Sequence, residues 1–191
     1  MSYKTVTRRL QFCSGHRVFG HESSCANLHG HNYVVYIEAT ASHLDKIGRI
    51  IDFKVLKELF GNWIDENWDH GFLWYKKDPV CRAIFTDTEA AMSLKNYQCS
   101  FNPTAEEMAY FLLTDIGPFL LEGSGVEVVS VTIEETENCK AQAFREVNRE
   151  EIQTTSQRIR KQNRKRKGQT SKARSAIRTS KDHSRVGKGV R

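Results

Sequence analysis

The apolar residues needed to build a core stop near residue 153. From there to Arg191 the chain contains no Phe, Trp or Tyr and only scattered aliphatic residues. Such a segment cannot bury enough apolar surface to offset the entropy that is lost on ordering. Any folded domain must therefore come from the part before it, and we expect one domain over 1–150 and a disordered tail over 151–191.

Charge divides the chain at the same place. Residues 151–191 hold 14 of the 29 Lys and Arg residues and two acidic residues, Glu151 and Asp182, for a net charge of +12. Residues 1–150 carry a net charge of −6. Basic density of this kind can bind nucleic-acid phosphates without sequence preference, although a solubilising, disordered terminus is the more usual role of such a segment.

Cysteine content and hydropathy indicate the compartment. The chain has five cysteines, an odd count, and none of them form a C-x-x-C pair. Its first residues, Met1 to Arg9, are polar and unlike a signal peptide, and no apolar run approaches the roughly 20 residues of a membrane span. These features predict a reduced, cytoplasmic protein without a membrane segment.

Hydrophobic spacing predicts the element order ββααββ. Alternating apolar residues mark strands over 4–15, 32–40, 126–135 and 141–147. Helical spacing marks one helix over 52–66 and another over 103–122, which Thr104 and Glu107 open with a capping box. Residues 68–74 look aromatic and irregular, and a short helix is expected at 88–94. Four antiparallel strands with two helices on one face make an α+β fold.

Three histidines frame the loop between the first two expected strands. His29 and His31 are two residues apart at the entrance to the second strand, so their side chains face the same way. His16 ends the first strand and can supply a third nitrogen. Three histidine ligands with a fourth position open are typical of catalytic zinc. Gly30 between the pair allows close approach of the backbone.

Other interpretations of this cluster stay open at this point. Many H-x-H pairs on strands bind nothing, and His21 is a rival to His16 as a ligand. Cys25, four residues before His29, is a base or nucleophile if a nearby positive charge favours its thiolate. It is otherwise an inert thiol, or a fourth ligand that closes a structural Cys-His₃ site.

Two further polar groups stand out. Asp69 precedes His70, and a carboxylate beside an imidazole can tune its pKa for proton transfer, provided that the backbone there is irregular. Glu135 belongs to an acidic group at the end of the third strand. A carboxylate in that position can accept two hydrogen bonds from the amino-amide edge of a guanine or pterin ring. A solvated surface role is the simpler interpretation of either group taken alone.

Taken together, these motifs resemble the 6-pyruvoyltetrahydropterin synthase / 6-carboxytetrahydropterin synthase family. The resemblance runs from about Leu10 to Phe144. The matching pieces, in the family's order, are Phe12-Cys13-Ser14-Gly15-His16-Arg17, Cys25-Ala26-Asn27-Leu28-His29-Gly30-His31-Asn32-Tyr33, Gly48-Arg49-Ile50-Ile51-Asp52-Phe53, Trp68-Asp69-His70, Pro103-Thr104-Ala105-Glu106 and Glu135-Thr136.

The resemblance implies a T-fold that assembles into a barrel-forming homo-oligomer with pterin sites between subunits. It implies zinc as cofactor and 7,8-dihydroneopterin triphosphate as substrate. The implied roles are zinc ligation by His16, His29 and His31, and catalysis by Cys25, Asp69 and His70. Pterin contacts are implied for Glu135, Thr104 and Glu106.

Within the family, three residues between Cys25 and His29 match the bacterial 6-carboxytetrahydropterin synthases. This spacing favours a carboxy product, released with acetaldehyde and triphosphate at the entry to queuosine-type 7-deazaguanine synthesis. The alternative is a 6-pyruvoyltetrahydropterin synthase. An alternative of another class is a non-catalytic, zinc-stabilised nucleic-acid-binding protein, which would need neither Cys25 nor the Asp69-His70 pair.

Overall fold

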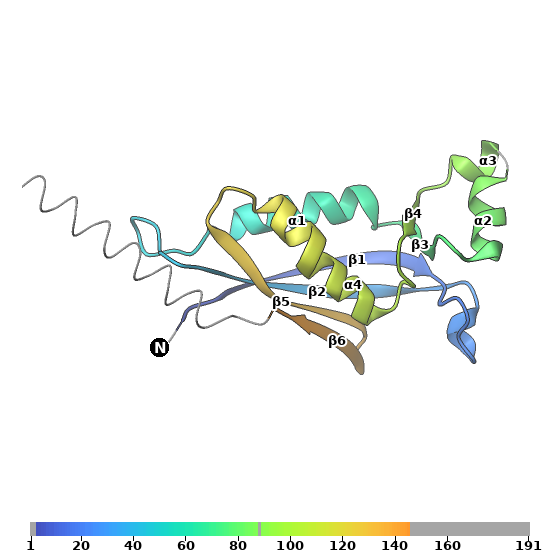
Figure 1. The fold of residues 1–191 in the computed structure, drawn as a ribbon, viewed down its shortest axis with the longest axis horizontal. Helices are drawn as coiled ribbons and strands as arrows, with labels where there is room; N and C mark the ends of the chain where they lie inside the picture. The colour runs from blue at the N-terminus through green and yellow to red at the C-terminus, as the bar shows by residue number, and fades with distance from the viewer. Residues whose placement is uncertain (1–2, 88, 146–191) are drawn as a thin grey trace, which may run out of the picture. The chain divides into compact units, whose positions relative to one another are not determined.

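The computed structural model describes residues 3–87 and 89–145 of the chain (Figure 1). The predicted domain boundary near residue 150 and the basic tail over 151–191 lie outside these residues. Both therefore stay predictions, together with nucleic-acid binding by the tail.

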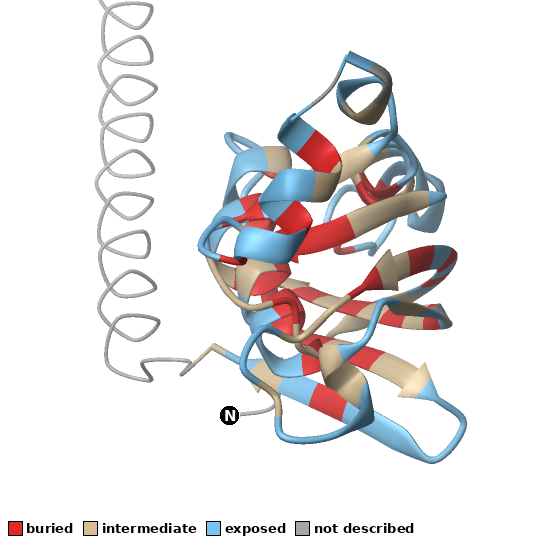
Figure 2. Cartoon of the chain, turned by 90° about the vertical axis from the view of Figure 1, so that its right-hand side faces the viewer, coloured by how far each residue is buried: buried red, intermediate tan, exposed pale blue. Residues whose placement is uncertain are grey.

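The four strands predicted from alternation are present and pair antiparallel in the order β1-β2-β5-β6. Their bounds are β1 (Val6–His16), β2 (His29–Ala41), β5 (Val126–Thr136) and β6 (Cys139–Phe144). Along β1, buried Leu10 and Phe12 alternate with exposed neighbours, and Figure 2 shows the same alternation of colours along the sheet. One face of the sheet therefore carries the core.

The predicted four-stranded, wholly antiparallel sheet is wrong in strand number and direction. Two short strands, β3 (Gly71–Tyr75) and β4 (Asn96–Cys99), extend the sheet to the order β4-β3-β1-β2-β5-β6. β3 runs parallel to β1 and pairs with its last three residues, and β4 runs parallel to β3. The expected irregular segment 68–74 thus contains a strand, and the sheet is mixed.

β3 does not show the apolar–polar alternation that predicts a half-exposed strand, because its residues are continuously apolar. Leu73 belongs to the main core, whereas Trp74 is buried in a second, smaller cluster with Cys81 and Phe85. Both faces of this strand are therefore covered. Strands buried on both faces lack the period of two that reveals a half-exposed strand.

The two predicted helices begin at their predicted caps. Asp52 accepts a hydrogen bond from Lys54 N at the start of α1 (Phe53–Asn67). The Thr104 hydroxyl accepts one from Glu107 N at the start of α4 (Ala105–Phe111). This helix continues through the π-helical turn η2 (Leu112–Ile116) into α5 (Gly117–Leu120).

Residues 76–102 add two helices to the predicted pair. α2 (Pro79–Thr86) was not predicted, and α3 (Glu89–Met92) lies within the short helix expected at 88–94. Phe85 of α2 packs on Phe72 and Trp74 of β3, with ring centroids 5.2 and 6.1 Å apart. Within the described residues, no helix has the length and apolar character needed to cross a membrane.

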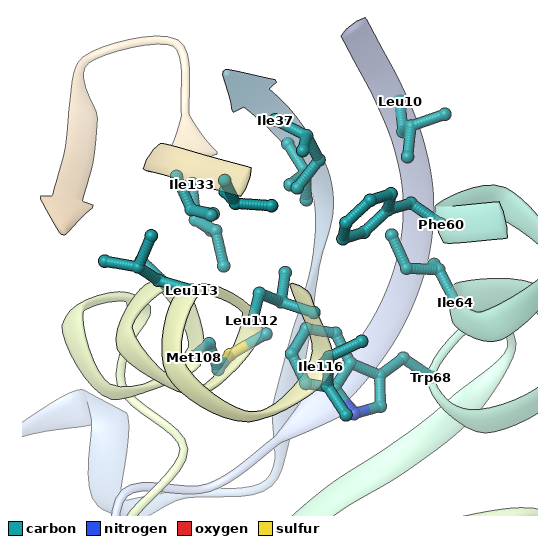
Figure 3. Packing of buried hydrophobic residues seen from close by; sticks show 14 of the residues in the cluster. Leu10, Ile37, Phe60, Ile64, Trp68, Met108, Leu112, Leu113, Ile116 and Ile133 are labelled. Carbon is teal, nitrogen blue, oxygen red and sulfur yellow. The ribbon is translucent and has the colours of Figure 1, made fainter. Parts of the chain in front are cut away.

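The main core lies between the sheet and the pair α1 and α4 (Figure 3). Phe60 and Ile64 of α1 face Met108 of α4 and Leu112 of η2 across it, and all four are almost fully buried. The two helices also meet through aromatic rings, since Trp63 and Phe111 have centroids 6.1 Å apart. This core fixes the strand ends that carry the polar site.

Phe60→Ala should therefore lower the free energy of unfolding by about 3–5 kcal/mol, because it opens a cavity in a site with no solvent exposure. Chemical denaturation of both proteins measures the difference. A loss below about 1 kcal/mol would mean that the core does not depend on this packing.

Candidate metal centre

The β1–β2 hairpin brings the three predicted histidines together. His16 lies directly opposite His29 in the antiparallel pair, and His31 follows two residues later on the same face. Directly opposite residues have neighbouring side chains. One ring nitrogen from each histidine lies within 4.8 Å of the others. The rival ligand His21 is not in this group, and its ring accepts a hydrogen bond from Ser23 N instead.

Gly30 permits the close approach of β1 and β2 that this arrangement needs. A Cβ atom at position 30 would lie 2.8 Å from the carbonyl oxygen of Ser14 on the opposite strand. Any other residue would push the two strands apart beside His29 and His31. The close approach predicted for this glycine is therefore confirmed.

Backbone carbonyls orient two of the rings. His16 Nδ1 lies 2.8 Å from the carbonyl oxygen of Pro103, and His29 Nδ1 lies 2.8 Å from that of Asn27. A carbonyl oxygen only accepts, so each Nδ1 carries the hydrogen and donates it. In the neutral rings the Nε2 atoms then present lone pairs. Metal-bound histidines are usually held by such a second hydrogen bond.

These lone pairs converge in a way that favours a cation. The Nε2 atoms of His16 and His29 are 3.0 Å apart, and Glu135 Oε1 lies 3.3 Å from His16 Nε2 and 3.5 Å from His31 Nε2. His31 Nε2 is buried and has no hydrogen-bond partner among the described residues. Acceptor atoms this close repel one another unless a proton or a metal ion lies among them.

Zinc suits this donor set. Two nitrogens at about 2.0–2.1 Å from a tetrahedral zinc lie roughly 3.3 Å from each other, close to the separation of the His16 and His29 nitrogens. Cys25 is not in the group of converging ligand atoms. The histidines can therefore hold a metal and leave one position for another ligand.

Acid should weaken metal binding at this centre. Burial lowers the pKa of His16 and of His31 from the ordinary 6.5, so both rings stay neutral down to somewhat lower pH. Once protons compete for these nitrogens, zinc affinity falls as pH decreases further. The metal-free fold should also lose stability below pH 6.5, because the unfolded chain binds protons there that the folded chain excludes. Zinc titrations and thermal melts between about pH 5 and 8 test both effects, and zinc affinity that is constant over that range would contradict them.

A buried tyrosine that sequence reasoning did not single out adjoins the cluster. Tyr33 follows His31 by two residues on the same face of β2, is fully buried, and its hydroxyl has no hydrogen-bond partner within the described structure. Burial raises the pKa of Tyr33 far above its usual value, and the charges of Glu135 and Cys25 raise it further. Because strand side chains alternate, the spacing that places His29 and His31 on one face also places Tyr33 there. This spacing is the sequence signal that could have identified Tyr33.

The Asp69-His70 pair lies at the edge of β1 that pairs with β3, opposite the edge that pairs with β2. Asp69 accepts hydrogen bonds from Cys13 N at 2.8 Å and from His70 Nδ1 at 2.6 Å. Burial alone would raise the pKa of Asp69, but these hydrogen bonds and the nearby charges of His70 and Lys95 lower it. His70 has a φ of 53°, which confirms the irregular backbone expected for the pair.

The His70 side chain is exposed at the surface. Its exposed fraction is 80%, and within the described residues no hydrogen bond or ion pair joins it to Cys25 or Glu135. It does border an open hollow of about 580 Å³ that edges of His29 and His31 also line. The structure therefore groups the three histidines with Glu135, while the Asp69-His70 pair makes no polar contact with them among the described residues.

The segment 103–106 borders the centre mainly through its backbone. The carbonyl oxygen of Pro103 orients His16, a contact that no side-chain pattern reveals. The Thr104 hydroxyl is engaged in capping α4, and Glu106 is exposed on the first turn of that helix. Pterin contacts by these two residues stay predictions.

Comparisons with known proteins agree on one family. Residues 5–146 match the family model described as 6-pyruvoyl tetrahydropterin synthase. The 6-carboxy-5,6,7,8-tetrahydropterin synthase of Rickettsia bellii is 38% identical over 133 residues, which cover 70% of this chain and 94% of that protein. The protein of the same name from Rickettsia typhi is 40% identical over the same shares.

Solved structures show the same fold. A crystal structure of an uncharacterized protein from Wolinella succinogenes covers 76% of this chain and all of its own, with a TM-score of 0.67 and 23% identity. The 6-pyruvoyl tetrahydropterin synthase of Caenorhabditis elegans covers 76% of this chain and 97% of its own, with a TM-score of 0.51 and 22% identity.

Proposed function

The chain belongs to the 6-pyruvoyl tetrahydropterin synthase family, and on that premise we propose that it is a zinc-dependent 6-carboxytetrahydropterin synthase. Its reaction converts 7,8-dihydroneopterin triphosphate and water into 6-carboxytetrahydropterin, acetaldehyde and triphosphate. The observation that carries this proposal is the convergence of three imidazole nitrogens beside Glu135, in a chain that carries Cys25 on the loop between the two histidine-bearing strands.

Two observations favour the carboxy product over the pyruvoyl product. The relatives at 38–40% identity are named 6-carboxy-5,6,7,8-tetrahydropterin synthases. Three residues separate Cys25 from His29, the spacing that resembles the bacterial carboxy enzymes.

The product would enter 7-deazaguanine synthesis of the queuosine type. Five unpaired cysteines suit a reducing, cytoplasmic setting.

The residues near the metal centre divide the chemistry among them. A zinc ion held by the three histidines would supply a Lewis acid that makes protons on the substrate side chain more acidic. Cys25, as the thiolate, takes the proton from the carbon next to the pterin ring. Glu135 accepts hydrogen bonds from the amino-amide edge of the pterin.

The Asp69-His70 pair serves the second proton transfer, and we assign it to the site of a neighbouring copy. The exposure of His70 and the absence of a polar contact between it and Cys25 or Glu135 among the described residues support this assignment. The assembly would be a barrel-forming homo-oligomer whose sites lie between subunits. Closed cyclic assemblies can share residues across each interface in this way.

Mixing two inactive variants should then restore turnover. Cys25→Ala and His70→Ala chains, unfolded together and refolded as mixed oligomers, would leave about a quarter of the sites with both native residues. Turnover of the mixture is compared with that of each variant refolded alone. A mixture as inactive as its components would place both residues in one chain's site.

Product analysis tests the proposed function. The zinc-loaded protein is incubated with 7,8-dihydroneopterin triphosphate, and the pterin product is identified by mass. We expect the carboxy product together with acetaldehyde. A pyruvoyl product would support the alternative enzyme, and absence of any product would leave a non-catalytic zinc protein as the better account.

A further inference from the structure

The loop 17–28 carries Cys25 with little regular structure to hold it. It contains one short turn, η1 (Ser24–Ala26), and it connects the two strands that bear the histidines. Val18 N donates to the carbonyl oxygen of Cys25 at 2.9 Å, which closes the loop near its base. A catalytic thiol on such a loop needs further contacts that set its distance from the metal centre.

Arg17 supplies one of these contacts. Its Nε donates to the carbonyl oxygen of Ala26 at 2.7 Å, on the residue directly after Cys25. Its Nη1 donates to Asp78 Oδ1 at 3.2 Å. The Arg17 side chain is 16% exposed and the Asp78 side chain is fully buried. One guanidinium therefore joins the Cys25 loop to a fixed carboxylate from a distant part of the chain.

Asp78 is itself held by the start of α2. Its Oδ1 also accepts hydrogen bonds from Val80 N at 2.9 Å and Cys81 N at 3.3 Å. α2 in turn packs on β3 through Phe85, so the carboxylate is anchored to the sheet. Burying this ion pair costs desolvation free energy, which the hydrogen bonds of Asp78 Oδ1 and of the Arg17 guanidinium offset in part, since Asp78 Oδ2 is buried without a hydrogen-bond partner among the described residues. A contact of this kind specifies geometry more than it adds stability.

We propose that Arg17 is a positioning residue for Cys25 and that Asp78, from the segment 76–102, orients it. Arg17 directly follows the metal-ligand candidate His16, so the contact with Ala26 ties the Cys25 loop to the strand end that carries the histidines. The role rests on the proposed function, in which Cys25 takes a proton from the substrate. Displacement of a reacting group by about 1 Å can lower a rate by a hundredfold.

Arg17→Lys tests the proposal, because a lysine ammonium keeps the charge but lacks the planar fork that reaches two acceptors. Arg145→Lys is the matched control, since Arg145 makes an exposed ion pair with Glu127 at 4.0 Å. Three quantities are measured on the full chain: kcat and KM, zinc content, and the rate at which iodoacetamide labels Cys25, resolved by peptide mass mapping. We expect Arg17→Lys to lower kcat about ten- to a hundredfold, with unchanged KM and zinc content and severalfold faster labelling.

Asp78→Asn keeps the proposal testable if Arg17→Lys does not fold. An asparagine oxygen can still cap α2, while the charge that orients Arg17 is lost. We expect a smaller loss of kcat and a smaller rise in labelling than for Arg17→Lys. A folded Asp78→Asn protein with native kcat and native labelling would overturn the role of Asp78.

The remaining outcomes separate this proposal from its rivals. Native kcat and native labelling in Arg17→Lys would overturn it. A raised KM at native kcat would mean that Arg17 binds substrate instead, and loss of zinc would mean that it supports the metal. If the native enzyme turns over no substrate, the proposed function fails, while the labelling rates still decide whether Arg17 positions the loop.

Discussion

Replacing His29 with alanine should lower zinc affinity by at least about a hundredfold and remove measurable turnover. His29 lies directly opposite His16 in the hairpin, and its Nε2 lies 3.0 Å from that of His16. Its loss leaves two imidazoles, and with them the position of any zinc-bound substrate is lost. Equilibrium dialysis with zinc and a turnover assay on the same preparation measure the two effects.

His43→Ala is the matched control for this loss. His43 is exposed, and its ring contacts the Ser42 hydroxyl rather than the cluster. Zinc content and turnover should both stay native in that variant. A His29→Ala protein that keeps a full complement of zinc would show that the metal binds elsewhere or that the cluster holds none.

Replacing Cys25 with alanine should leave zinc in place and lower turnover about a thousandfold, the usual share of a positioned base. The reason is geometric: Cys25 lies outside the group of converging histidine nitrogens. Zinc content, kcat and substrate binding are measured together. The thiol is thus expected to act on the substrate and not on the metal.

Cys139→Ala serves as the control for the thiol, because Cys139 is an exposed cysteine at the start of β6. It should behave as the native protein. If Cys25→Ala lost its zinc while Cys139→Ala kept it, Cys25 would be a metal ligand. The closed Cys-His₃ site would then replace the catalytic one.

The elements with a clear period were predictable from sequence, and the others were not. β1 and β2 alternate because one face meets the core and the other does not. β3 has apolar residues on both faces, since α2 covers the face that would otherwise be exposed. The covering helix α2 belongs to the segment 76–102, and no local sequence pattern predicts how this segment packs.

The candidate site shows the same division. His29 and His31 share a strand face, so their convergence followed from spacing alone. The carbonyl oxygens of Pro103 and Asn27 that orient the rings carry no sequence signal, because every residue has a carbonyl. The Asp78 that holds Arg17 is 61 residues away in the chain, and the fold alone brings the two together.

Zinc K-edge X-ray absorption of the zinc-loaded protein tests most directly whether the metal is held by three histidines and left open to substrate. The measurement reports the element and distance of the atoms bound to the metal. We predict nitrogen and oxygen neighbours at about 2.0–2.2 Å, and the same spectrum from Cys25→Ala. A sulfur neighbour at about 2.3 Å in the native protein, lost in Cys25→Ala, would contradict an open catalytic centre.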